Sequence, residues 1–419
     1  MVRTMADRPA PPDPSLTGAS PSGPSPVDRR ARSAVAALFF TNGAIPANLL
    51  PRYPEIKDAL QLGNTAYGLA VTAMPIGAIV VGPAAAWMIR RFGSGRVAVA
   101  GTMAAAVCIV AAGVSGSVAM LVAALFLAGG MDALTDVAQN SHGLRVERRY
   151  RRSIINSFHA VWSVGAVTGG LMAAGAIASG LSLGAHLVVS GVVFSAVALA
   201  CLRLCLPGRD DDGRDAPETR EPGTGQEAAS SRVGPRAVIV LVALVLIAIS
   251  GTMVEDAGNS WATLYLSSSL GAPHAVAAGG FIALVGAQFI GRMLGDRMSD
   301  RFGRRTVARA GGGVCAVGMG LTLAMPSVAG TIAGFACAGF GVATLVPAAM
   351  SQADRLPGLR PGTGLTLVSW LMRIGFLASP PLVGMVADAV GLRFGLLTIV
   401  AAGVLTLICS SALPGRERG

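Results

Sequence analysis

The chain has 419 residues, of which 53% are hydrophobic and 13% are charged. A soluble domain carries roughly 25% charged residues, so the composition excludes the two or three soluble domains that the length alone would allow. The formal net charge is +11, but the arginines stand in loops between apolar segments and form no single basic face, which argues against nucleic-acid binding. Lys57 is the only lysine, so a Walker phosphate loop is absent, and we expect no enzymatic activity, no cofactor and no metal site.

Long apolar segments without charged residues follow one another along the chain. A helix needs about 20 apolar residues to cross a bilayer, and the longer segments contain Gly, Ser or Pro residues at which the chain can turn back. The sequence therefore predicts an all-α membrane protein with twelve transmembrane helices, over 33–51, 64–89, 96–115, 118–142, 153–178, 183–206, 237–262, 274–296, 305–325, 328–352, 363–387 and 392–413.

The first 32 residues are rich in Pro, Ser, Ala and Arg, a composition that buries too little apolar surface to fold. They lack the apolar core and the cleavage site of a secretory signal. A second segment rich in Pro, Gly and charged residues lies in the middle of the chain and has the composition of a linker. We expect a disordered N-tail, an N-terminal six-helix half, a linker, a C-terminal six-helix half and a C-tail over 1–32, 33–206, 207–236, 237–414 and 415–419, respectively.

The arginines are divided unevenly between the two sets of alternating loops. One set, which includes the tails and the linker, carries most of them, whereas the other set holds only Arg52, Lys57 and Arg393. Cytoplasmic loops of membrane proteins carry the excess of Lys and Arg. We therefore expect both termini in the cytoplasm, and the heavy use of Ala, Gly and Arg favours a bacterial inner membrane.

Polar residues occur inside the first and fourth predicted spans. Asn42 and Asn48 of the first span could line a solute path or form hydrogen bonds between helices, and both interpretations stay open. Asp132, Asp136 and Asn140 of the fourth span are spaced i, i+4, i+8 and share one helix face. A carboxylate at membrane depth costs roughly 3 kcal/mol, and burial favours the neutral form that a proton carrier needs. We expect Asp132 and Asp136 to bind the coupling proton; the alternative is a structural pair with an Arg of another helix.

Other predicted spans also carry polar or aromatic residues. Glu255 and Asn259 share a face of the seventh span, and Gln288 and Arg292 share a face of the eighth. A single His or Trp in a membrane is as often a packing residue as a ligand contact. On this pattern we expect the solute cavity to be lined by Asn140, His159, Trp162, Glu255, Asp256, Asn259, Gln288, Arg292, Trp370 and Arg373.

An Arg-dense loop, 300–305, has the sequence Asp-Arg-Phe-Gly-Arg-Arg and lies between the eighth and ninth predicted spans. Gly303 allows a tight reversal there, and Asp300 can pair with a guanidinium group or a helix N-terminus. A diverged copy with Gly93 lies 210 residues upstream, and Trp162 and Trp370 repeat at an offset of 208. These offsets indicate an internal duplication, as in a transporter made of two halves.

This loop, placed between two spans, resembles the cytoplasmic loop signature of the major facilitator superfamily. The first copy has Arg90 where the signature has an acidic residue. The resemblance implies the two-half fold of that family and a cytoplasmic gate formed here by Arg90, Arg91, Gly93, Asp300, Arg301, Gly303, Arg304 and Arg305. Scattered positions, including Glu255 with Trp261, resemble the fucose-permease-like branch. Members of that branch are often proton-coupled through an acid of the fourth helix, which corresponds here to Asp136 or to Asp132.

The patterns together predict a monomeric secondary transporter that moves a small polar solute with protons by alternating access. A proton-driven antiporter that exports drugs or metabolites is an alternative, although the fifth span lacks the Gly-Pro pair that drug antiporters carry. A non-transporting membrane sensor is a third interpretation. A sensor would not need the charged residues that the predicted spans contain.

Overall fold

The computed structural model describes residues 25–150, 154–207, 234–357, 359 and 363–414. These residues form helices and connecting turns, and they contain no strand. Twelve helical segments among the described residues are long and apolar enough to cross a membrane, which confirms the predicted all-α fold with twelve spans. Large apolar side chains such as Val107, Val192 and Ile239 are more than 60% exposed, as expected of a surface that faces lipid. Most of the predicted tails and linker lies outside the described residues.

In the described part of the chain, the twelve spans comprise eighteen α-helices and four short helical turns. The first six spans contain α1 (Pro26–Leu49), η2 (Leu50–Arg52), α2 (Tyr53–Ala59), α3 (Asn64–Val71), α4 (Ala73–Val81), η3 (Gly82–Ala84), α5 (Ala85–Phe92), α6 (Ser94–Gly113), α7 (Val118–Tyr150), α8 (Ile155–Ala178) and α9 (Leu183–Leu202). The other six contain α10 (Pro235–Leu264), η4 (Tyr265–Ser269), α11 (His274–Phe302), α12 (Arg304–Ala324), α13 (Val328–Val342), α14 (Leu345–Ala353), α15 (Thr363–Leu371), α16 (Arg373–Val390), α17 (Leu392–Gly395), α18 (Leu397–Cys409) and η5 (Ser410–Ala412).

Several spans are interrupted where a proline removes a backbone donor. Pro75 cannot donate to the carbonyl four residues earlier, and α3 ends at Val71. Pro347 has the same effect on Ala343, where the break between α13 and α14 falls. Such breaks are tolerated at membrane depth where the helix faces protein or a cavity.

The first helix begins earlier than predicted, at Pro26 instead of residue 33. A capping box explains the difference, because the Ser25 side chain accepts from the Asp28 amide while the Asp28 carboxylate accepts from Ser25. The pair satisfies donors that the first turn would otherwise leave open. Asp28 also forms an ion pair with Arg149 at 2.7 Å, which joins the start of α1 to the end of α7. Helix α7 itself runs to Tyr150, beyond residue 142 where the predicted span ends, and its last turn carries Arg148 and Arg149.

The duplication inferred from the sequence is visible in the backbone. Gly93 and Gly303 both adopt the left-handed region, with φ of 87° and 82°, and each ends one helix and starts the next. A residue with a side chain is strained at such φ values. Gly165 and Gly375 are also equivalent, because an added Cβ at each would collide with the first helix of its own half, α1 and α10 respectively.

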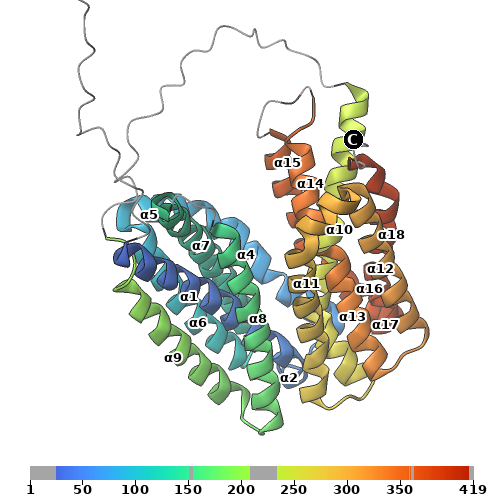
Figure 1. Ribbon diagram of the computed structural model, residues 1–419. Helices are drawn as coiled ribbons and strands as arrows, with labels where there is room; N and C mark the ends of the chain where they lie inside the picture. The colour runs from blue at the N-terminus through green and yellow to red at the C-terminus, as the bar shows by residue number, and fades with distance from the viewer. Residues whose placement is uncertain (1–24, 151–153, 208–233, 358, 360–362, 415–419) are drawn as a thin grey trace, which may run out of the picture.

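The two halves, α1–α9 and α10–α18, lie side by side and converge at one end (Figure 1). The end of the bundle where α1 begins and where the Gly93 and Gly303 turns lie is called the terminal end below. The close contacts between the halves are made by α8 with α11 and by α3 with α16. The α3–α16 seam lies at the opposite end, where Gly68 faces the Pro380 carbonyl and Gly384 faces Asn64. Among the described residues, neither α5 nor α7 packs closely on α14 or α15 at the terminal end.

Candidate functional site

A cavity of about 340 Å³ lies between the two halves. The part of its lining that comes from α3 and α4 is apolar and includes Val71, Met74 and Ile79. The C-terminal half contributes polar side chains from α10, α11 and α16 together with apolar ones such as Phe281 and Phe376. Of the residues predicted to form the site, seven line this cavity: Asp132, Trp162, Glu255, Asp256, Asn259, Gln288 and Arg373. The structure therefore brings together residues from both halves that are far apart in the sequence.

Asn42 is the centre of a hydrogen-bond network beside this cavity. Its Nδ2 donates to Asp132 Oδ1 at 2.8 Å, and its Oδ1 accepts from Trp162 Nε1 at 2.9 Å. Since the indole N–H can only donate, Trp162 fixes the orientation of the Asn42 amide. Gln139 Nε2 also approaches Asn42 Oδ1, at 3.3 Å. Helices α1, α7 and α8 are thus joined around Asp132.

Small residues allow this network to form. An added Cβ on Gly43 would collide with the Trp162 carbonyl, and one on Gly165 would collide with the Phe40 carbonyl. Close backbone approach at such positions is a common way of packing membrane helices. Because α1 and α8 approach so closely, the Trp162 indole reaches Asn42. The sequence analysis did not single out Gln139, which is completely buried.

A second group of polar residues lies closer to the terminal end and does not line the cavity. Asn140 Nδ2 donates to Asp136 Oδ1 at 3.0 Å, and the exposed Asp136 carboxylate interacts electrostatically with His159 and with Arg373 of the other half. The His159 ring packs edge-on against Phe39 at a centroid distance of 5.1 Å. Asp136 lies four residues, or about 6 Å along the helix axis, beyond Asp132. The two acids predicted to bind the proton therefore have different surroundings.

The polar wall of the C-terminal half centres on α10. Gln288 Nε2 donates to Glu255 Oε2 at 2.8 Å, and Arg292 Nη2 lies 3.5 Å from the same oxygen. Asp256 Oδ2 and Asn259 Oδ1 are buried and have no hydrogen-bond partner in the described part of the chain. Arg292 thus contributes through Glu255 without lining the cavity itself.

Trp370 was predicted to line the site, but it is 67% exposed and does not line the cavity. Trp162, at the equivalent position of the first half, lines the cavity and is hydrogen-bonded. The two tryptophans therefore make different contacts, although the duplication places them at matching positions.

The cavity is closed at the end opposite the terminal end. Tyr53, Tyr67 and Trp261 form edge-to-face contacts, with ring centroids 5.8 Å and 5.0 Å apart. Tyr67 Oη donates to the Ser260 carbonyl of the other half at 2.7 Å. The sequence analysis named Trp261 only for its resemblance to the fucose-permease-like branch and missed both tyrosines. Trp261 is in fact completely buried.

Asp388 of α16 completes this closure. Its carboxylate oxygens accept from the backbone N–H groups of Asn64 and Thr65, at 3.0 Å and 2.8 Å. These are the first two residues of α3, whose own N-cap residue, Gly63, has no capping side chain. A side chain of one half therefore caps a helix of the other.

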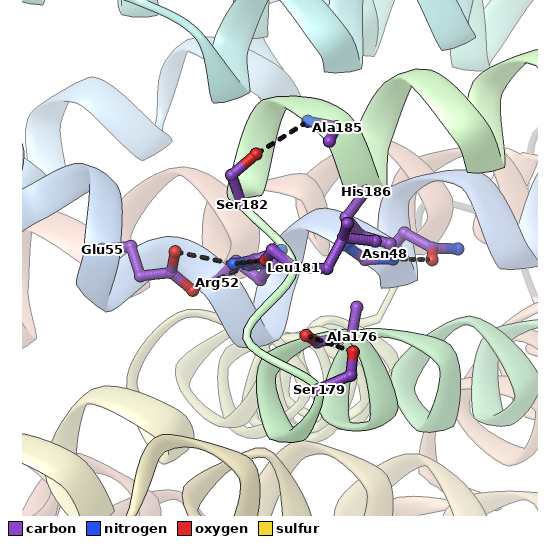
Figure 2. Close-up of polar contacts among 9 residues, drawn as sticks. All are labelled: Asn48, Arg52, Glu55, Ala176, Ser179, Leu181, Ser182, Ala185 and His186. Atoms are coloured by element: carbon purple, nitrogen blue, oxygen red, sulfur yellow. Dashed lines mark hydrogen bonds and ion pairs between the residues drawn. The ribbon is translucent and has the colours of Figure 1, made fainter.

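The same end contains Arg52, which the sequence analysis assigned to an outside loop. Figure 2 shows its guanidinium group between the Glu55 carboxylate and the Leu181 carbonyl, with Nε–Oε1 and Nη2–O distances of 2.7 Å and 3.0 Å. Arg52 is only 3% exposed, so it joins η2 to the α8–α9 connection instead of carrying free surface charge. Asn48 Oδ1 accepts from His186 Nε2 at 2.8 Å (Figure 2), which favours the interhelical interpretation of Asn48.

The predicted gate residues at the terminal end do not form an ion pair across the halves within the described residues. Asp300 and Arg90 are exposed. Arg304 donates to Ser351 Oγ at 2.8 Å, and Arg305 donates to the Leu413 carbonyl at 2.9 Å. The loop after Gly303 is therefore held within its own half, and the cavity is not locked at this end.

The comparisons with known proteins agree with this architecture. The family model of the Major Facilitator Superfamily matches residues 34–298 and 281–418. Membrane protein MosC of Rhizobium meliloti is 29% identical over 386 residues, which cover 92% of this chain and 90% of that protein.

Solved structures show the same fold. A bacterial homologue of the human lysosomal transporter Spinster, inward-facing and unoccupied, aligns with a TM-score of 0.71 at 15% identity and covers 95% of this chain and 100% of that one. The transporter FucP, in the outward conformation, aligns with a TM-score of 0.57 at 18% identity over 91% of this chain and 97% of that one. Because the family model matches nearly the whole length of this chain, the chain belongs to the major facilitator superfamily, a family of membrane transporters and not of enzymes.

Proposed function

We propose that this transporter moves a small polar solute together with protons across a bacterial inner membrane, by alternating access between its two halves. The terminal end would face the cytoplasm, because the Arg-rich loops lie there. The described conformation, closed at the opposite end, would then be the one that releases solute inward. The observation that carries the proposal is the position of Asp132, on the cavity surface and inside the Asn42 network.

Asp132 is the better of the two candidate proton carriers. Its neighbours are the Asn42 amide and the Asp136 carboxylate, and no ion pair reaches it in the described residues. A bare carboxylate without a cation is costly at membrane depth, whereas the protonated form is neutral. A protonated Asp132 can thus accompany a conformational change that the carboxylate opposes.

Asp136 is suited to a different role. It is exposed on the side toward the terminal end, and Arg373 of the other half interacts with it electrostatically. We assign it to the transfer of the proton between Asp132 and the cytoplasm. This assignment departs from the family resemblance, which pointed first to Asp136.

The test uses purified protein in liposomes that contain a pH-sensitive dye, with a panel of neutral sugars, amino sugars and organic acids added outside. We expect at least one solute to cause proton uptake, and an imposed pH gradient to drive accumulation of that solute. Asp132→Asn should abolish the response to the gradient and retain solute exchange. The exposed Asp58 of α2 offers a matched control, and Asp58→Asn should respond as the parent does.

Full gradient-driven uptake by Asp132→Asn would refute the assignment of the carrier. Proton release from the liposomes on solute entry would instead show exchange in opposite directions, as in the antiporter alternative. Solute movement that ignores the gradient in the parent protein would refute coupling altogether.

A further inference from the structure

Two acidic residues, Glu255 and Asp256, follow one another on α10, and both line the cavity. Glu255 accepts from Gln288 at 2.8 Å and lies 3.5 Å from Arg292, so its negative charge has partners. No ion pair reaches Asp256 in the described residues, and its buried Oδ2 has no hydrogen-bond donor there. Of the two acids, Asp256 is therefore the one whose charge is not compensated when it is ionised.

The groups around Asp256 do not offset a negative charge. Asp256 interacts with Ser379 of α16 and with the like-charged Glu255. Arg373 lines the same cavity, but the acid with which it interacts electrostatically is Asp136. An ionised Asp256 would thus meet a hydroxyl group and a second carboxylate, without a cation of its own.

The hydroxyl group of Ser379 is oriented by another partner. Its Oγ donates to the Met253 carbonyl at 3.2 Å, and a hydroxyl group has a single hydrogen to donate. Toward Asp256, Ser379 can then only accept, and a carboxyl group donates only when it is protonated. The protonated form also avoids the cost of a bare carboxylate at membrane depth. The hydrogen bonds and the charges around Asp256 therefore both favour its neutral form in this conformation.

Asp256 lies beside the closure of the cavity at the end opposite the terminal end. It interacts electrostatically with Tyr53 and Tyr67, whose rings form the closure together with Trp261. Ser379 belongs to α16, which packs on α3 where the two halves meet. Separation of the halves at this end would admit water, and water solvates a carboxylate. The cost of ionising Asp256 therefore depends on whether this end is closed.

We infer that Asp256 is a second proton-binding residue of this transporter: it holds a proton while the end opposite the terminal end is closed, and its carboxylate favours opening of that end. This inference rests on the proposed function and adds a residue to its coupling mechanism. Asp256 takes up a proton from the outer solution when that end is open. It releases the proton through the cavity, which is not locked at the terminal end, to the cytoplasm. The O–H bond of the carboxyl group is the only bond that forms and breaks.

Electron spin resonance distances across the closed end test this inference without a solute. Spin labels replace the exposed Ala59 and Ala389, in a background without the six native cysteines, and the protein is held in liposomes. We expect a change from mildly acidic to mildly alkaline pH to increase the ratio of long to short distances at least about fivefold, the low end of typical coupling between linked equilibria. Asp256→Asn, which stays neutral, should abolish this response and remain closed. Asp132→Asn and the control Asp58→Asn should respond as the parent does.

Infrared spectroscopy detects the proton itself, because the C=O stretch of a protonated carboxyl group disappears on ionisation. A titration of the parent over the same pH range should remove such a band as the end opens. Asp256→Asn should lack this titrating band, and Asp58→Asn should retain it. Ser379→Ala gives a second test should Asp256→Asn fail to fold. It removes the acceptor of the carboxyl hydrogen, so the opening transition should move to lower pH.

Three results would overturn the inference: a pH response that Asp256→Asn retains, a titrating infrared band that Asp256→Asn leaves unchanged, or a transition that Ser379→Ala moves to higher pH. The last result would mean that Ser379 donates to a carboxylate. Solute movement that ignores an imposed pH gradient in the parent would refute the proposed function, whereas proton binding by Asp256 and its effect on opening would stand. Loss of the gradient response in Asp132→Asn together with an unchanged pH response in Asp256→Asn would leave the proposed function intact and refute this inference.

Discussion

The contact between Asp388 and the start of α3 should set the balance between the two conformations of the transporter. The carboxylate of Asp388 in the C-terminal half accepts from two backbone N–H groups of the N-terminal half. Once the halves separate at this end, the contact cannot be made. Its whole free energy therefore favours the closed opposite end, and replacing Asp388 with Ala should shift the equilibrium toward opening there.

The magnitude follows from helix capping. Loss of an N-cap side chain costs about 0.5–2 kcal/mol, and the exposed position of Asp388 places this contact in the lower half of that range. A loss of about 0.5–1 kcal/mol changes a two-state ratio by roughly two- to fivefold. Asp388→Asn keeps an acceptor oxygen and should shift the ratio less, since Asn caps helices about as well as Asp.

Electron spin resonance distances can measure this shift. Spin labels at the exposed Ala59 and Ala389, in a background without the six native cysteines, should report a short distance for the closed end and a longer one for the open end. We expect Asp388→Ala to increase the ratio of long to short distances two- to fivefold. Asp58→Ala serves as the control. An unchanged ratio in Asp388→Ala, or an equal shift in Asp58→Ala, would refute the reasoning.

Three further predictions concern stability, the gate and topology. Gly165→Ala should destabilise the protein by about 1–3 kcal/mol, as for other overpacked positions, because the new Cβ collides with the Phe40 carbonyl; an unchanged melting temperature would contradict this packing. Asp300→Asn should slow solute uptake more than Arg90→Gln, because only Asp300 offers a carboxylate to a closing gate, and equal loss in a liposome uptake assay would argue against that asymmetry. A cysteine placed at 220 should resist an impermeant thiol reagent in intact cells, and labelling there would invert the proposed orientation.

The sequence by itself determined the fold of this protein. In lipid, the backbone N–H and C=O groups of charge-free apolar segments can form their hydrogen bonds only in helices or in a closed barrel. The length and number of these segments predicted the twelve spans. The repeated glycines at 93 and 303 indicated the duplication because a left-handed turn excludes most other residues. These conclusions rest on local chemistry and on the solvent, and both can be read along one chain.

The candidate site was determined only in part. Spacing placed Asp132 and Asp136 on one face of a helix, but the face of a helix does not reveal which neighbour it meets. Only the packing of α1 against α8 brought Asn42 between Asp132 and Trp162. Asp132 lines the cavity, whereas Asp136, one turn further along α7, does not.

The tertiary structure alone decided which equivalent residues share a role and how the cavity is closed. Trp162 and Trp370 occupy matching positions in the two halves, yet only Trp162 lines the cavity. Asp388 caps α3 from more than 300 residues away, and no pattern in either segment predicts that contact. Hydrogen bonds between distant segments depend on how whole helices are placed relative to one another. All the packing contacts together determine that placement, and the local periodicity of the sequence carries no information about it.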